Sequence, residues 1–187
     1  MKRLLICGSA STLWTDLDAV GRWDHDVMAL NYAGLFLPIR VDHWVSVHHD
    51  FFGPALRMWD WHKRDIQPKR PQTHASEAGE GVDHVWSFRP HDYTGYFATK
   101  IALEIGYDSI ILAGVPMDGS GHFYDKLDNG KSPYHFPMNA VWNALPKDKI
   151  RSMSGQTKAL FGYPSHESIG HPYLTAGVQH LARLTFA

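Results

Sequence analysis

The sequence predicts an α/β fold in which helices cover both faces of a doubly wound, mostly parallel sheet. Apolar runs of strand length alternate along the chain with segments of helical periodicity, as expected of consecutive strand and helix units. Residues 109–114, SIILAG, form an apolar run without alternation, which is typical of a strand covered on both faces. The stretch before it spaces Phe97, Ile101 and Ile105 along one helical face, and Gly106 ends that helix.

The elements before this unit follow the same order. Residues 3–7, RLLIC, predict a first strand in which the single cysteine, Cys7, is a core residue. A loop of small residues over 8–12 leads into a short helix over 13–20. We expect further strands over 26–31 and 44–48 and a helix over 54–65, because Pro54 suits the first turn of a helix.

The later elements are shorter and less regular. Two short strands are predicted over 72–76 and 84–86, and their order in the sheet is not indicated by the sequence. The polar segment 117–137 is longer than most connections in a compact domain, so it is a candidate lid or long loop. A short helix over 139–145, a strand over 150–153 and a helix over 174–184 complete one domain spanning 1–187.

Composition limits the classes of partner. A formal net charge of −1 over 187 residues argues against a nucleic-acid partner held by bulk charge. No apolar stretch approaches the ~20 residues of a membrane span, and the first strand begins too early to leave room for a signal peptide. With its single cysteine the chain suits a reducing compartment. We therefore expect a cytoplasmic protein with no membrane span, and a homo-oligomer stays open.

Polar residues follow the predicted strands where each strand ends, at the edge of a parallel sheet where ligands bind. They are Gly8, Ser9, Ser11, Thr12, Asn31, His48, His49, Asp50, His74, Ser76 and Asp118, joined by Arg89, His91, Asp92, Tyr93, Thr94 and Gly95 at the start of the long helix. Unpaired amides at such a helix start attract phosphate or carboxylate. Ordinary structural roles remain the alternatives, since the 8–12 loop can be a plain connection, Asn31 a turn former and Thr94 a helix cap.

The sequence contains 13 histidines, whose positions indicate different roles. His48 and His49 are neighbours in a predicted strand and point to opposite faces, so no metal site is predicted there. His122 and His135 lie in the 117–137 segment near Tyr124, where either one could act as a general acid or base that moves in with substrate. Surface histidines without a role are the alternative. Serine hydrolase and zincin motifs are absent from the sequence.

A longer pattern resembles a known family. Thr94-Gly95 with the later residues Ala98, Ala102, Leu103, Ile105, Gly106, Tyr107, Ile110, Leu112, Gly114 and Asp118 resembles the S-G, A, A-x-x-L-G-Y, I-x-L-x-G-x-D pattern of bacterial CMP-sialic-acid sialyltransferases and of pterin pyrophosphokinase-like proteins. The 7–13 loop resembles that family's C-G-N-G-P-S-L nucleotide loop, and Asn31 falls at a family asparagine. The chain departs at Ser9 and Ala10 in the loop and at Pro116, where the family carries an acid.

The resemblance implies a Rossmann-like fold, a nucleotide at the strand ends and a histidine general base. The leading hypothesis is a glycosyltransferase-like enzyme that uses a nucleotide-activated sugar or a similar donor and requires no cofactor. Its expected residues are His122 or His135 as base, Gly8, Ser9, Ser11, Thr12, Asn31, Thr94 and Gly95 for the nucleotide, Arg89 for phosphate or carboxylate, and His49, Asp50, Asp118 and Tyr124 for substrate.

Two other classes stay open. In a Mg²⁺-dependent nucleotide phosphoryl or pyrophosphoryl transferase, Asp50, Asp118 or Asp125 would bind the metal. A non-enzymatic nucleotide-binding protein would keep the pocket without the chemistry, because a fold does not fix a function.

Overall fold

The computed structural model describes residues 1–21, 25–63, 67–88, 93–125 and 140–165, which form one seven-stranded sheet. The strands are β1 (Arg3–Cys7), β2 (Asp26–Leu30), β3 (His43–Val45), β4 (Gln72–Ala75), β5 (His84–Val85), β6 (Ser109–Ala113) and β7 (Ile150–Ser152). They lie in the order β5-β4-β3-β2-β1-β6-β7, and all the pairings are parallel. The predicted Rossmann-like α/β fold is confirmed, with a sheet that is fully rather than mostly parallel.

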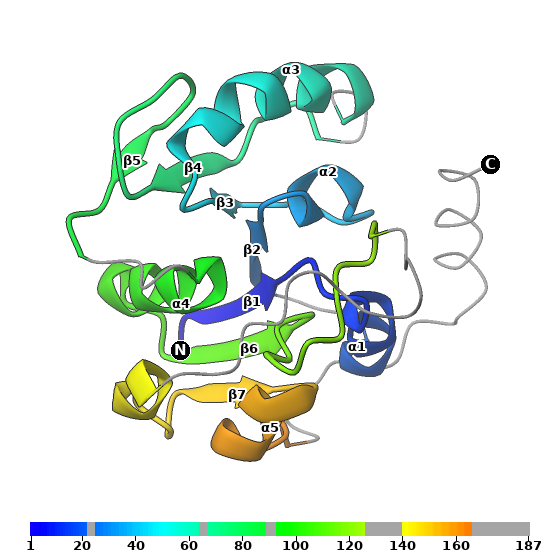
Figure 1. The fold of residues 1–187 in the computed structure, drawn as a ribbon, viewed down its shortest axis with the longest axis vertical. Coiled ribbons are helices and arrows are strands. Elements are labelled where there is room, and N and C mark those ends of the chain that lie inside the picture. Colours follow the sequence, from blue (N-terminus) through cyan, green and yellow to red (C-terminus); the bar gives the residue numbers. More distant parts are fainter. Residues whose placement is uncertain (22–24, 64–66, 89–92, 126–139, 166–187) are drawn as a thin grey trace.

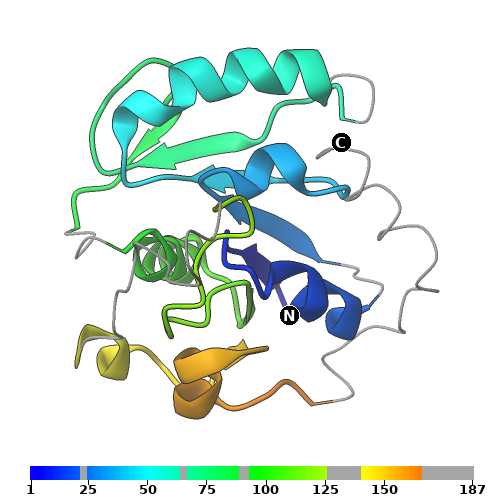
Figure 2. The same cartoon turned by 45° about the vertical axis from the view of Figure 1, so that its right-hand side comes forward.

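Helices cover both faces of this sheet (Figures 1 and 2). The helical elements are α1 (Leu13–Val20), α2 (Ala33–Phe36), η1 (His49–Phe51), α3 (Phe52–His62), α4 (Thr94–Ile105), η2 (Ala140–Ala144) and α5 (Gly155–Phe161), of which η1 and η2 are 3₁₀ helices. One core cluster joins α1, α2 and α3 to the sheet, and a second joins α4 and η2 to its other face.

Alternation along the central strand explains the two core layers. In β1, Leu5 and Cys7 pack on the side of α1, whereas Leu4 and Ile6 pack on the side of α4. Cys7 is fully buried, as the sequence predicts, and burial raises the pKa of its thiol. The thiol therefore stays protonated and serves as a core group.

Several predicted boundaries move. The strand expected over 44–48 ends at Val45, because the chain turns into η1, and the helix expected over 54–65 spans Phe52–His62. The predicted 139–145 helix is the 3₁₀ helix η2. Helices α2 and α5 were not predicted, because with 4 and 7 residues they are too short to show a clear helical period. The expected helix over 174–184 and residues 126–137 of the predicted lid lie outside the described residues.

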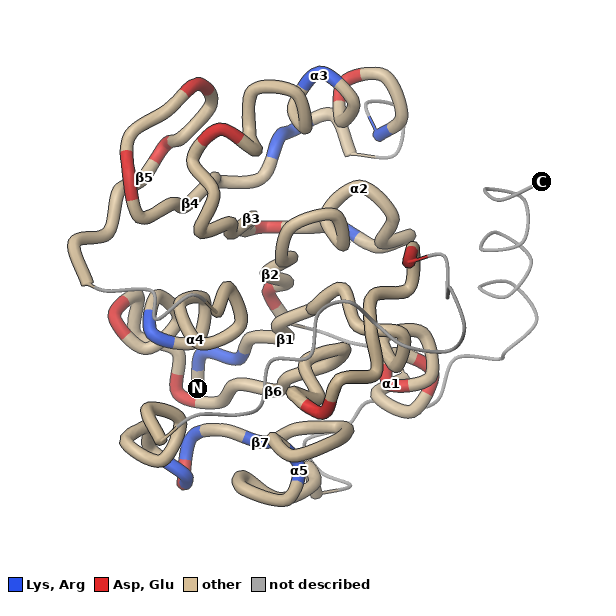
Figure 3. The backbone as a smooth tube through the Cα atoms, in the orientation of Figure 1, with Lys and Arg blue, Asp and Glu red and all other residues tan. Residues whose placement is uncertain are grey.

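The charged residues are distributed over the fold. Lysine and arginine are interspersed with aspartate and glutamate over the described chain (Figure 3), in keeping with the net charge of −1. Among the described residues, we find no helix with the length and apolar character needed to cross a membrane.

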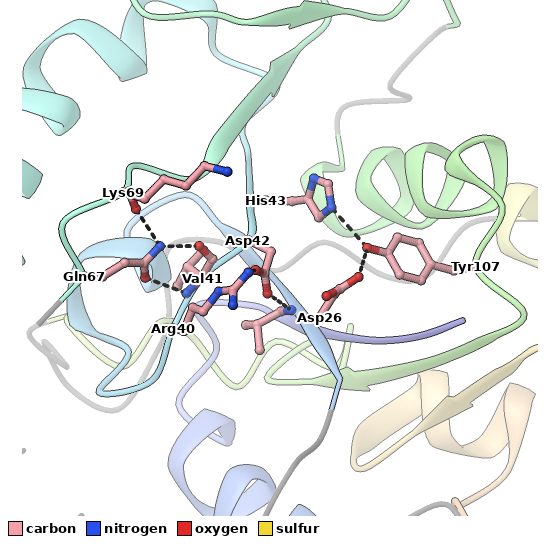
Figure 4. Close-up of polar contacts among 9 residues, drawn as sticks. Asp26, Arg40, Val41, Asp42, His43, Gln67, Lys69 and Tyr107 are labelled. Atoms are coloured by element: carbon pink, nitrogen blue, oxygen red, sulfur yellow. Dashed lines mark hydrogen bonds and ion pairs between the residues drawn. The ribbon is translucent and has the colours of Figure 1, made fainter. Parts of the chain in front are cut away.

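A chain of buried polar side chains crosses the core on the α4 side of the sheet. The indole N–H of Trp86 donates to His74 Nδ1 at 3.1 Å, so the second ring nitrogen of His74 carries the hydrogen that reaches His43 at 3.0 Å. His43 Nε2 then donates to the Tyr107 hydroxyl at 3.1 Å, and Tyr107 donates to Asp26 at 2.7 Å (Figure 4). Each donor has an acceptor, which is what buried polar groups require.

Burial sets the protonation states of this chain. It lowers the pKa of His43, lowers the pKa of His74 to about 3, and raises the pKa of Tyr107. All three groups are therefore neutral near pH 7. His74, which the sequence analysis placed among the ligand-edge residues, is instead a buried core residue, because it lies within β4 and not after its end.

Candidate functional site

A cavity of about 890 Å³ opens at the carboxyl ends of β6, β1, β2 and β3. Its lining combines Gly8, Ser9 and Ala10 after β1, Leu30, Asn31 and Tyr32 at the end of β2, Val47 and His48 after β3, Thr94 and Gly95 of α4, and Gly114 to Asp118 after β6. In the sheet, β1 lies between β2 and β6, so the connection after β1 leads to one side of this strand and β6 lies on its other side. Such a switch point is the ligand site of open α/β sheets.

Glycines allow the backbone to close around the floor of this cavity. A Cβ on Gly8 would lie 2.2 Å from the carbonyl oxygen of Gly114, so the ends of β1 and β6 touch through their backbones. Gly114 itself has a φ of +64°, a conformation that favours glycine. A Cβ on Gly95 would meet a methyl carbon of Val115 at 2.8 Å, which brings the start of α4 against the same floor.

Replacing Gly8 with alanine is expected to lower the free energy of unfolding by ~2–4 kcal/mol, because the new methyl group meets backbone that cannot move aside. Urea denaturation measures the change. Gly53→Ala is the matched control, since its Cβ would meet only the flexible end of Glu80. Equal costs at the two positions would contradict a packing role for Gly8.

Five of the predicted nucleotide residues line the cavity, namely Gly8, Ser9, Asn31, Thr94 and Gly95, and three of them form side-chain hydrogen bonds there. Ser9 Oγ donates to the carbonyl oxygen of Leu30 at 3.1 Å, and Asn31 Nδ2 donates to Thr94 Oγ1 at 3.3 Å. Asn31 has a φ of 46°, and its Oδ1 is buried without a hydrogen-bond partner among the described residues. A buried acceptor left unpaired costs free energy that a ligand donor would recover.

Ser11 and Thr12 do not line the cavity, because their hydroxyls point to other protein groups. Ser11 Oγ donates to the carbonyl oxygen of Ser120 at 2.8 Å, and Thr12 Oγ1 lies 3.3 Å from an Asp16 carboxylate oxygen. The predicted nucleotide role of both residues stays a prediction. Each one supports a segment that shapes the cavity wall.

Asp16 is a positioning group that the sequence analysis missed. One of its carboxylate oxygens accepts from the Gly114 amide at 2.8 Å and from Ser154 Oγ at 2.7 Å. Burial raises the pKa of this carboxyl group, although these hydrogen bonds oppose the shift. An acid on the buried face of α1, between Leu13 and Val20, was the available signal. Asp16 thereby ties α1 to the end of β6 and to the start of α5.

A histidine and a carboxylate pair inside the cavity. His122 Nδ1 lies 3.2 Å from a carboxylate oxygen of Asp125, and the backbone amide of His122 donates to the same oxygen at 2.8 Å. The imidazole stacks on Tyr124 with 4.9 Å between centroids and 4° between planes. A carboxylate can only accept, so Nδ1 carries the hydrogen and Nε2 is the basic nitrogen. This geometry suits a general base held by an orienting acid.

The 118–125 segment is tied to the loop after β1. The amide of Ser11 donates to the carbonyl oxygen of Gly121 at 2.9 Å, and the amide of Phe123 donates to that of Ser9 at 2.9 Å. The Phe123 ring packs against Trp14 and Phe36 with centroid distances of 5.3 and 5.5 Å. His122 therefore already lies at the cavity wall in this structure, and its predicted movement with substrate stays a prediction.

The remaining predicted site residues divide into three groups. Asp50, Asp118 and Tyr124 line the cavity, whereas His49 lies outside the lining, 3.4 Å from a carboxylate oxygen of Glu77. Arg89 and His135 lie outside the described residues. No group of three or more histidine, cysteine, aspartate or glutamate side chains is placed to hold a metal within the described part of the chain.

A row of aromatic rings completes the wall, and only its member Tyr124 was predicted as a site residue. The Tyr32 ring lies 5.2 Å from Phe51 and 5.2 Å from Tyr124, in edge-on contacts that connect the end of β2 with η1 and the 118–125 segment. Aromatic residues are common in cores as well as in sites, so their number alone could not reveal this row.

Comparison with known proteins gives a fold relationship. No family model matches the chain, and a search of curated proteins finds no match. A solved structure of the sialyltransferase CstII from Campylobacter jejuni, in complex with the substrate analogue CMP-3FNeuAc, has a similar fold with a TM-score of 0.59. The match covers 91% of this chain and 89% of that one at 14% sequence identity, so it shows a shared fold.

Proposed function

We propose that this chain is a glycosyltransferase-like enzyme that transfers a sugar from a nucleotide-activated donor to a hydroxyl group. The pairing of His122 with Asp125 carries the proposal, because both line the cavity that also contains Ser9, Asn31 and Thr94. The fold shared with a sialyltransferase that was solved with a CMP-sugar analogue supports the choice of donor.

The proposed step needs one base and a site for the leaving phosphate. His122 Nε2 takes the proton from the acceptor hydroxyl while that oxygen forms a bond to the anomeric carbon of the donor. The bond from this carbon to the phosphate oxygen breaks, and its electron pair leaves with the nucleotide. Asp125 holds the imidazole in the required tautomer and stabilises the imidazolium that forms.

The donor would lie across the ends of β1 and β2. Asn31 Oδ1 would accept a hydrogen bond from the base or ribose, and Thr94 at the first turn of α4 would contact the phosphate. The amides at the start of a helix favour an anion. Ser9 would act through its backbone, since its hydroxyl already bonds to Leu30.

Nucleotide binding can be tested by thermal unfolding. Saturating CMP or CMP-3FNeuAc is expected to raise Tm by ~5–10 °C, because a ligand that binds only the folded state stabilises it. Asn31→Ala should remove most of the shift, whereas the exposed control Asn143→Ala should keep it. The absence of a shift with CMP, UMP, AMP and the sugar analogue alike would refute the proposal.

A metal-dependent phosphoryl transferase is the second candidate. Its three proposed carboxylates, Asp50, Asp118 and Asp125, all line the cavity. The same unfolding assay with Mg²⁺ and with EDTA separates the two classes. A nucleotide shift that requires Mg²⁺, together with phosphoryl transfer to water or an acceptor, would favour this second candidate over sugar transfer.

A further inference from the structure

The cavity changes in character along the sheet. The ends of β1 and β2 supply polar groups such as Ser9 and Asn31, and the 118–125 segment supplies His122. Beyond β3, the apolar residues Phe51, Pro54 and Met58 line the cavity next to His48 and Asp50. These strands are consecutive in the sheet, so the polar and apolar parts are the two ends of one space. A ligand that fills it would carry polar groups at one end and an apolar group at the other.

The apolar end continues onto the surface of α3. Pro54, Met58 and Trp61 are spaced four and three residues apart, which places them on one side of the helix. Met58 is 42% and Trp61 85% exposed, while the opposite side of α3 buries Phe52, Leu56 and Trp59. We call Pro54, Met58 and Trp61 the α3 stripe.

Two charged residues of α3 beside the stripe are paired in the described part of the chain. Arg57 donates to Glu80 at 2.9 Å, and Asp60 pairs with Arg70. The stripe itself therefore offers apolar contact and not charge. Exposed apolar groups that continue from a cavity are typical of a ligand groove.

The aromatic row links this end of the cavity to the proposed base. Tyr124 stacks on His122, and Tyr32 contacts both Tyr124 and Phe51 with centroid distances of 5.2 Å. A molecule whose hydroxyl reaches His122 would therefore extend along Tyr32 toward Met58. In the proposed reaction that molecule is the acceptor, because His122 takes the acceptor proton.

We propose that the acceptor is a glycoside with an apolar aglycone, and that the aglycone lies along the α3 stripe. This inference rests on the proposed function, in which His122 meets the acceptor hydroxyl. Pro54 and Met58 belong both to the stripe and to the cavity lining, which makes the aglycone continuous with the rest of the acceptor. The sugar ring would then lie between Tyr32 and His122.

Paired glycosides test this inference through binding alone. Phenyl and methyl β-glycosides of glucose and galactose are titrated into the full chain saturated with CMP, and heat of binding is recorded. The phenyl compound of at least one sugar is expected to bind about 10-fold more tightly, from the extra apolar area that it buries. Met58→Gln and Trp61→Ala should reduce that ratio to about twofold or less while leaving CMP affinity unchanged.

Tyr163→Ala is the control, because Tyr163 is also exposed, at 44%, but belongs to neither the stripe nor the cavity lining. Equal binding of the two glycosides, no binding of either, or an unchanged ratio in both variants would overturn the inference. A dimer that dissociates in Trp61→Ala, seen by light scattering, would overturn it in favour of contact between copies. CMP protection that persists in these cases would leave the proposed function standing.

Discussion

Replacing His122 with alanine is expected to lower the turnover of sugar transfer by about 10²–10⁴-fold while nucleotide affinity stays within about twofold. The expected loss follows from removing the proton acceptor, and the unchanged affinity follows from the separate location of Asn31 and Thr94. Initial rates with a CMP-sugar donor measure turnover, and Tm shifts with CMP measure binding. Loss of both together would instead indicate that His122 is needed for the shape of the site.

Asp125 provides the second half of this test. Asp125→Asn keeps the size of the side chain and removes its charge, so turnover should fall, but less than in His122→Ala. The fall follows because an amide at position 125 no longer holds the imidazole in the required tautomer. Turnover equal to that of the wild type would show that Asp125 does not orient His122. His62→Ala is the control, since His62 is exposed and lies outside the cavity lining, and His135→Ala tests the other predicted base.

Acid is expected to destabilise the fold through His74. Its pKa falls from 6.5 in the unfolded chain to about 3 in the folded protein, so between these values the unfolded chain binds more protons. The free energy of unfolding is therefore highest above pH 6.5 and decreases as the pH falls. Between about pH 8 and about pH 5, His74 alone should account for a loss of ~2 kcal/mol.

A glutamine at position 74 isolates this effect. His74→Gln can still accept from Trp86 and donate to His43, but it cannot titrate. We expect urea denaturation to show that the free energy of unfolding decreases between about pH 8 and about pH 5 by ~2 kcal/mol less in the variant than in the wild type. His43 contributes to the decrease in both proteins. If the free energy of unfolding decreased equally with pH in the wild type and in His74→Gln, His74 would be protonated in the folded state.

The fold was more predictable from the sequence than the site was. Continuous apolar runs such as 109–113 are typical of buried strands, so the central strands could be predicted directly. Helix α4 could be predicted from the helical spacing of its apolar residues. Strand order could not, because it depends on contacts between segments far apart in the sequence. Short elements also escaped, since α2 spans a single helical turn.

The candidate site was predicted only where strand ends marked it. Ser9, Asn31 and Asp118 follow strands and do line the cavity. Ser11 and Thr12 follow the same strand as Ser9, but their hydroxyl groups form hydrogen bonds with Ser120 and Asp16. These partners lie elsewhere in the sequence or on the next helix, so the bonds could not be predicted from the strand end alone. The pairing of His122 with Asp125 spans only three residues, but it becomes recognisable once their ring and carboxylate are seen to meet.

The backbone bonds between the 9–11 loop and the 118–125 segment have a mechanical consequence. Backbone hydrogen bonds of Ser11 and Phe123 join the loop proposed to bind the donor to the segment that carries His122, so we expect the two to move together. A donor that displaces this loop would carry the imidazole with it and preserve their relative alignment. The entropy of bringing base and donor loop together is thus spent during folding and not again in each catalytic cycle.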